Sequence, residues 1–187
     1  MVKVNEKAPD FSGEAYWNDN STKISPGDFK GKWVVLFFYP ADFSFVCPTE
    51  LGDLADNYSK FKKEGAEVIS VSTDTVFVHK AWHDNSPTIK KIKFPMLADP
   101  SRKICHSYGT LIEDSGLSIR ATFLIDPTGT IKAFEFHDNA IGRNTDELLR
   151  KLQAAKYVAA NKGMVCPINW RPGQKSLKAG LDLVGKI

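Results

Sequence analysis

The longest apolar run in the chain spans residues 33–41 and is continuous rather than alternating. Its β-branched and aromatic side chains are typical of a central strand covered on both faces, and Pro40 is a residue that ends such a strand. Apolar positions then recur at helical spacing, which predicts an amphipathic helix over residues 47–64 with Gly65 as its stop signal. A second apolar run follows at residues 68–71. Strand, helix and strand in this order predict a right-handed crossover between parallel strands, and therefore an α/β fold.

The pattern after the second run predicts shorter elements and then a long helix. They are helices at 75–83 and 101–108, strands at 121–125 and 130–136, and a last helix that begins near Asn144. The turn sequence Asp126-Pro127-Thr128-Gly129 separates the two strands, so they should form an antiparallel hairpin. From Asn161 the periodicity fades into scattered glycines and prolines. We therefore expect one folded domain over residues 1–160 and an irregular tail over residues 161–187.

Composition and charge exclude several classes of protein. The chain has 187 residues, of which 42% are hydrophobic and 25% charged, as expected for a single folded domain. The net charge of +3 comes from dispersed lysines, so nucleic acid is not expected as a partner. The longest apolar run is too short to cross a membrane, and the first residues lack the apolar core of a signal peptide. We expect a cytoplasmic protein with no membrane partner.

The three cysteines, at positions 47, 105 and 166, are too few for a secreted disulfide scaffold. Cys47 falls at the predicted start of a helix, and Pro48 is well suited to a first turn. Free backbone amides and the positive end of the helix dipole stabilise a thiolate there. The alternative is a small buried hydrophobic residue, as most intracellular cysteines are. Two neighbours favour a nucleophile: the Ser44 hydroxyl can bind the sulfur or a substrate oxygen, and Pro40 can shield the thiolate from water.

A disulfide partner for Cys47 must come from elsewhere in the chain or from another chain. A thioredoxin-like dithiol site has a second cysteine three places after the first, but that position is Glu50 here. Cys166, in the tail, is the stronger candidate. The spacing alone leaves open whether the two cysteines meet within one chain or between two chains. Cys105, inside a predicted short helix, is interpreted as a structural thiol.

Three separated segments carry a family resemblance: residues 38–51, Val165-Cys166-Pro167 and residues 181–187. The chain resembles the typical two-cysteine peroxiredoxins over its full length, in particular the peroxidase component of bacterial alkyl hydroperoxide reductase. This resemblance implies a thioredoxin-like fold with a mixed central sheet and flanking helices for residues 1–160. It also implies that the tail at residues 161–187 carries the second functional cysteine.

The resemblance assigns chemistry to the two cysteines. Cys47 corresponds to the peroxidatic cysteine, which reduces a hydroperoxide and becomes a sulfenic acid. Cys166 corresponds to the resolving cysteine, which is normally contributed by the partner subunit. The implied partners are a hydroperoxide substrate, a flavoprotein disulfide reductase or thioredoxin as the reductant, and a second copy of the chain. The homodimer is expected to assemble further into a decamer.

Four other residues match the family's site. Pro40 and Ser44 fill its proline and its threonine-or-serine positions. Arg120 matches the active-site arginine, although without the resemblance it would be interpreted as part of a surface salt bridge. Glu50 corresponds to the acidic residue that orients that arginine. By chemistry, the arginine would stabilise charge that develops on the breaking oxygen–oxygen bond.

No cofactor or metal is expected. The chain has no glycine fingerprint for flavin or nicotinamide. His79 and His83 are spaced to share one helical face, but no third metal ligand is evident. Two other functions stay open from the residues alone: a binding protein in which Cys47 is a sensor without turnover, and a thiol–disulfide oxidoreductase, which Glu50 disfavours.

Overall fold

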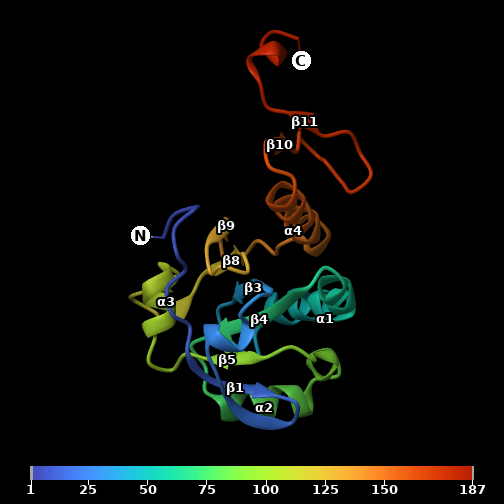
Figure 1. The fold of residues 1–187 in the computed structure, drawn as a ribbon. Helices are drawn as coiled ribbons and strands as arrows, with labels where there is room; N and C mark the ends of the chain where they lie inside the picture. The colour runs from blue at the N-terminus through green and yellow to red at the C-terminus, as the bar shows by residue number, and fades with distance from the viewer. Residues whose placement is uncertain (1, 187) are drawn as a thin grey trace. The chain divides into compact units, whose positions relative to one another are not determined.

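The computed structural model describes residues 2–186, and the chain divides into two compact units between Thr145 and Asp146. The first unit is built on a seven-stranded sheet with the order β2-β1-β5-β4-β3-β8-β9 (Figure 1). Its strands are β1 (Gly13–Trp17), β2 (Asn20–Ile24), β3 (Trp33–Phe38), β4 (Ala66–Ser72), β5 (Met96–Ala98), β8 (Arg120–Ile125) and β9 (Ile131–His137). The domain boundary expected after residue 160 stays a prediction.

The strand β3 lies inside this sheet, as its continuous apolar sequence predicted. All six of its residues are buried. It pairs with β4 in parallel, from Trp33↔Ala66 to Phe38↔Val71, and with β8 in the antiparallel direction. The β8–β9 hairpin is antiparallel as well. The mixed sheet confirms the α/β class, the parallel crossover and the hairpin.

Three helices accompany the sheet in the first unit: α1 (Cys47–Lys63), α2 (Val76–Asn85) and α3 (Lys103–Tyr108). The helix α1 packs on β4, and α2 packs on β1 and β5. Figure 1 shows α1 and α3 on either side of β3 and β4. Next to α3, the rings of Phe38, Tyr108 and Phe123 pack with centroids 4.9–5.7 Å apart. The central strands are therefore covered on both faces, which explains their lack of alternation.

The hydrophobic pattern missed the strands β1, β2 and β5 and the two-residue strands β6 (Leu111–Ile112) and β7 (Leu117–Ser118). The β1–β2 hairpin forms the sheet edge, where only three of its ten residues are buried. The strand β5 has three residues, too few for any periodicity. Short or edge strands therefore left no detectable alternation.

The second unit contains α4 (Thr145–Ala160), the strands β10 (Met164–Val165) and β11 (Leu177–Lys178), and a 3₁₀ turn at Leu181–Leu183. Within the expected irregular tail, β10 and β11 form a small antiparallel hairpin that the pattern did not predict. Between them, the buried Trp170 packs on Tyr157 of α4, and Arg150 donates to the Trp170 carbonyl. These contacts order a segment that is rich in glycine and proline.

Within residues 2–186, no helix has both the length and the apolar character that a membrane crossing requires.

Candidate active site

Cys47 is the first residue of α1, as the sequence predicted, and Pro48 follows it in the first turn. The carbonyl of Val46 accepts hydrogen bonds from the backbone amides of Thr49 and Glu50 and thereby closes that turn. Proline fits this position because a first-turn amide has no partner within the helix. The local sequence therefore places the thiol where the helix dipole favours negative charge.

The sheet register brings Arg120 to this thiol. Arg120 is the first residue of β8, and the next residue, Ala121, pairs with Phe38 at the end of β3. The loop that leads to Cys47 leaves from this end of β3. The Nη1 of Arg120 donates to the Sγ of Cys47 at 3.3 Å, although the residues are 73 positions apart. Both side chains are buried, so this contact is shielded from solvent.

Glu50 lies on the same side of α1 as Cys47, one turn further along. It is 6% exposed and contacts two arginines. The Nη1 of Arg120 donates to its Oε2 at 2.8 Å. Arg143 donates through its backbone N to Oε1 at 2.7 Å, and through Nε and Nη2 to the two carboxylate oxygens at 2.9 and 2.8 Å. Glu50 therefore fixes both guanidinium groups.

Arg143 was missed by the sequence analysis. Its side chain is buried. The guanidinium lies 3.3 Å from the centroid of the Phe37 ring, and Nη1 donates to the Ala121 carbonyl and to Thr122. A buried arginine in a loop has no local signature that separates it from an exposed one. The one available signal was Glu50, since a buried carboxylate offers more acceptor positions than one arginine fills.

Charged groups of both signs set the electrostatics of this cluster. Burial favours a raised pKa for the Glu50 carboxyl, but hydrogen bonds and charge from Arg143, and charge from Arg120, hold that pKa below its ordinary value. Burial lowers the pKa of Arg143, and Glu50 opposes this effect. Glu50 therefore pairs with two guanidinium groups, and the negative charge of Glu135 also acts on Arg143. The guanidinium of Arg120 lies beside the Cys47 sulfur within this cluster.

Ser44 and Pro40 lie in the segment between β3 and α1. Pro40 is buried and lies two residues after the end of β3. The Ser44 hydroxyl donates to the Ala41 carbonyl at 2.8 Å and thereby closes a turn. Within residues 2–186, the hydrogen bond to the Cys47 sulfur comes from Arg120 and not from Ser44. The serine oxygen can still accept a hydrogen bond while its proton is donated.

Cys166 belongs to the second unit and directly follows β10. Its Sγ lies 3.9 Å from the Ala154 carbonyl of α4. Burial raises the pKa of the Cys166 thiol, and the positive charge of Arg150 partly offsets this rise. The thiol is half-buried and therefore partly accessible to solvent.

Cys105 is fully buried, and its pKa is raised to about 12 by burial and by the nearby Asp99 carboxylate. A thiol with that pKa has roughly a thousandfold less thiolate near pH 8 than a free cysteine with a pKa of about 8.5. We expect iodoacetamide to label Cys105 slower by that factor in the native protein than in the unfolded chain. Peptide mass spectrometry measures both rates. Equal rates in the two states would contradict the structural interpretation.

The two histidines of α2 do not converge on a metal. The Nδ1 of His79 lies 2.7 Å from Asp42 Oδ2, and the Nδ1 of His83 lies 3.5 Å from the Tyr16 hydroxyl. Among residues 2–186, there is no group of three or more histidine, cysteine or acidic side chains that could hold a metal ion. The absence of a cofactor stays a prediction.

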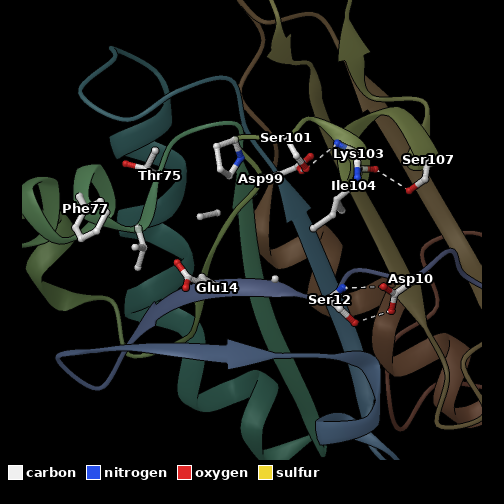
Figure 2. Close-up of a pocket in the computed structure, with 14 residues that line it drawn as sticks. Asp10, Ser12, Glu14, Thr75, Phe77, Asp99, Ser101, Lys103, Ile104 and Ser107 are labelled. Carbon is white, nitrogen blue, oxygen red and sulfur yellow. Dashed lines mark hydrogen bonds between the residues drawn. The ribbon is translucent and has the colours of Figure 1, made fainter.

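A separate cavity of about 640 Å³ lies at the amino-terminal end of α2 and the carboxyl end of β5 (Figure 2). Asp10 and Ser12 are hydrogen-bonded to each other at its wall, and Glu14, Phe77 and Lys103 also line it. None of the predicted site residues lines this cavity. It is therefore distinct from the Cys47 cluster.

Comparison with known proteins identifies the class of this site. Residues 4–134 match the model of the AhpC/TSA family, and residues 154–184 match that of the C-terminal domain of 1-Cys peroxiredoxin. The chain belongs to the AhpC/TSA family. The first match contains the whole Cys47–Glu50–Arg120 cluster, and the second contains Cys166.

Similar proteins span the whole chain of this peroxiredoxin. It is 50% identical over 187 residues to alkyl hydroperoxide reductase C of Salmonella typhimurium, a match that covers 100% of both chains. It is 49% identical over 189 residues to alkyl hydroperoxide reductase C of Staphylococcus epidermidis, and this match also covers 100% of both chains. The solved structure of Enterococcus faecalis AhpC shares 50% identity with a TM-score of 0.86, covering 89% of this chain and 100% of the other. Reduced Plasmodium vivax 2-Cys peroxiredoxin shares 34% identity with a TM-score of 0.90, covering 94% and 93%. The protein is therefore a thiol-dependent peroxidase with a thioredoxin-like fold.

Proposed function

We propose that this peroxiredoxin reduces hydrogen peroxide and organic hydroperoxides through a sulfenic acid at Cys47 and a disulfide with Cys166 of the partner subunit. One observation carries the first half of the proposal: the buried Cys47 sulfur accepts a hydrogen bond from Arg120, which is itself paired with Glu50. Such a site stabilises both a thiolate and the negative charge that develops on the leaving oxygen of the peroxide.

In the first step, the Cys47 thiolate attacks one oxygen of the hydroperoxide. A sulfur–oxygen bond forms, the oxygen–oxygen bond breaks, and the second oxygen takes up a proton and leaves as water or an alcohol. The sulfur is oxidised by two electrons, and the peroxide is reduced by two. Arg120 donates to the sulfur and to the developing charge. Ser44 supplies a further polar contact, and Pro40 keeps bulk water from the thiolate.

In the second step, the Cys166 thiol of the partner subunit attacks the sulfenic sulfur, water leaves and a disulfide forms. Because the Cys47 sulfur is buried at the first turn of α1, that turn must open before the sulfurs can meet. A dithiol reductant then restores both thiols. A flavoprotein disulfide reductase or thioredoxin would supply these electrons, and the chain would need no cofactor of its own.

The sheet edge supports assembly of two chains. The strand β9 is the last strand of the sheet, and its Phe134 and Phe136 are 38% and 39% exposed. Such an edge can pair with another strand. In this proposal, a second copy of the chain covers β9. The exposed Phe43 and Phe77 support further assembly, which we propose gives a ring of five dimers. The cytoplasmic location stays a prediction.

The intersubunit disulfide is tested by non-reducing electrophoresis after one equivalent of hydrogen peroxide. The wild-type protein should run as a covalent dimer, because each Cys47 joins the Cys166 of its partner. Cys47→Ser and Cys166→Ser should each run as a monomer. Cys105→Ser is the matched control and should still form the dimer, since its thiol is fully buried. A covalent dimer in Cys47→Ser, or an oxidised wild-type monomer that has lost two thiols, would contradict the proposal.

A further inference from the structure

Asn139 and Arg120 are joined by three hydrogen bonds, and each residue contributes both backbone and side-chain atoms. The backbone N of Arg120 donates to the Asn139 Oδ1 at 3.1 Å. The Nε and Nη2 of Arg120 donate to the Asn139 carbonyl at 3.0 and 2.8 Å. Asn139 therefore contacts both the backbone and the guanidinium of Arg120.

The side chain of Asn139 supplies the acceptor for the backbone N–H of Arg120. Arg120 opens β8, and its ladder partner His137 is the last residue of β9. Arg120 is 3% exposed, so its backbone N–H needs an acceptor within the protein. The amide oxygen of Asn139, two residues after the end of β9, takes that position. The side chain thereby ties the loop after β9 to the first residue of β8.

The carbonyl bonds orient the guanidinium. A guanidinium is planar and rigid, so fixing its Nε and Nη2 edge also fixes the direction of Nη1. Nη1 is the atom that lies 3.3 Å from the Cys47 sulfur and 2.8 Å from Glu50 Oε2. A shift of the Asn139 carbonyl would therefore move Nη1 relative to the sulfur.

We propose that Asn139 is a positioning residue whose side-chain amide holds its own carbonyl in place and so aims Arg120 at the Cys47 sulfur. The inference rests on the proposed role of Arg120. Among residues 2–186, the hydrogen bonds of Asn139 described above go to Arg120 and not to the Cys47 sulfur, so it acts through Arg120. It would therefore affect the oxidation of Cys47 and leave the attack of Cys166 on the sulfenic acid unchanged.

The test compares variants that remove one side-chain acceptor from the same loop. Asn139→Leu keeps the approximate size of the side chain but lacks the Oδ1 acceptor, and Asn139→Ala is a second variant in case leucine is not accommodated. Asp138→Leu is the matched control, because the Asp138 carboxylate accepts from the backbone N of Ala140 and not from Arg120. Stopped-flow measurements of the reduced proteins give the rates of sulfenic acid formation and of disulfide formation separately.

We expect both Asn139 variants to form sulfenic acid about tenfold more slowly, because small misplacements of a catalytic group cost factors of this order or more. Their disulfide step should keep its wild-type rate. The pH midpoint for alkylation of Cys47 should also move upward, which a purely structural role would not cause. Asp138→Leu should match the wild-type protein in all three measurements.

Two results would overturn the inference while leaving the function intact. One is that Asn139→Leu and Asn139→Ala form sulfenic acid at the wild-type rate, with an unchanged pH midpoint for alkylation of Cys47, although Arg120→Met is strongly impaired. The other is an equal loss in Asp138→Leu, which would indicate general loosening of the loop. A wild-type rate in Arg120→Met would instead remove the proposed role of Arg120, and the proposal for Asn139 would fail with it.

Discussion

Replacing Arg120 by methionine is expected to lower kcat/KM for hydrogen peroxide by about a hundredfold to a thousandfold. This is the loss that follows removal of one donor aimed at charge that develops in a transition state. Arg120 is such a donor here, since its Nη1 lies 3.3 Å from the Cys47 sulfur in a buried cluster. Methionine keeps the length and apolar stem of the side chain but removes the donors and the charge. Peroxide consumption with a saturating thiol reductant measures the effect.

Three further variants show which property of Arg120 causes that loss of activity. Cys47→Ser gives the background rate of the assay, because it removes the nucleophile. Arg120→Lys keeps the charge but lacks the planar fork, so it should recover only part of the lost activity. Arg102→Met is the matched control: Arg102 is an exposed arginine outside the Cys47 cluster, and its variant should retain wild-type activity. Activity in Arg120→Met within about twofold of wild type would exclude the transition-state role that we assign to it.

The thiol at the helix start could be predicted from sequence because its determinants are local. Pro48 follows Cys47 directly, and the continuous apolar run before them ends at a proline. The structure confirms that α1 begins at Cys47. Local pattern did not show that Arg120 lies beside the sulfur, because this contact depends on the antiparallel register of β3 and β8. Only the resemblance to a known family supplied that expectation.

Neither the local sequence pattern nor the family resemblance predicted Arg143. Its position is set by the loop after β9, which turns back over the first turn of α1 and over Phe37. No periodic pattern in the sequence indicates that the loop folds back in this way. Asn139 was missed for the same reason, since its function as an acceptor depends on where β9 ends relative to Arg120. Residues that act through non-local contacts leave little trace in one sequence, whereas helix starts and buried strands are predicted well.

Replacing Glu50 by alanine is expected to lower the free energy of unfolding by about 3–5 kcal/mol, the usual cost of removing one partner from a buried ion pair. Glu50 is 6% exposed and pairs with both Arg120 and Arg143. Without it, the two buried guanidinium groups would lose the carboxylate that pairs with both of them. Chemical denaturation of the reduced protein at fixed concentration measures the loss. The exposed pair Lys91–Asp56 gives the control, because Asp56→Asn should cost about 1 kcal/mol or less.

The ionisation of Glu50 also predicts a pH dependence of stability with a known sign. Because the pKa of the folded Glu50 carboxyl lies below its ordinary value, its charge stabilises the fold above the unfolded pKa of about 4.3. That contribution is lost as pH falls through the lower folded pKa. Glu50→Gln, which keeps the shape but never ionises, should therefore be less stable than wild type at pH 7 and approach it as the solution is acidified. A stability difference that stays constant between pH 7 and about pH 3 would show that the carboxylate's charge does not stabilise the cluster.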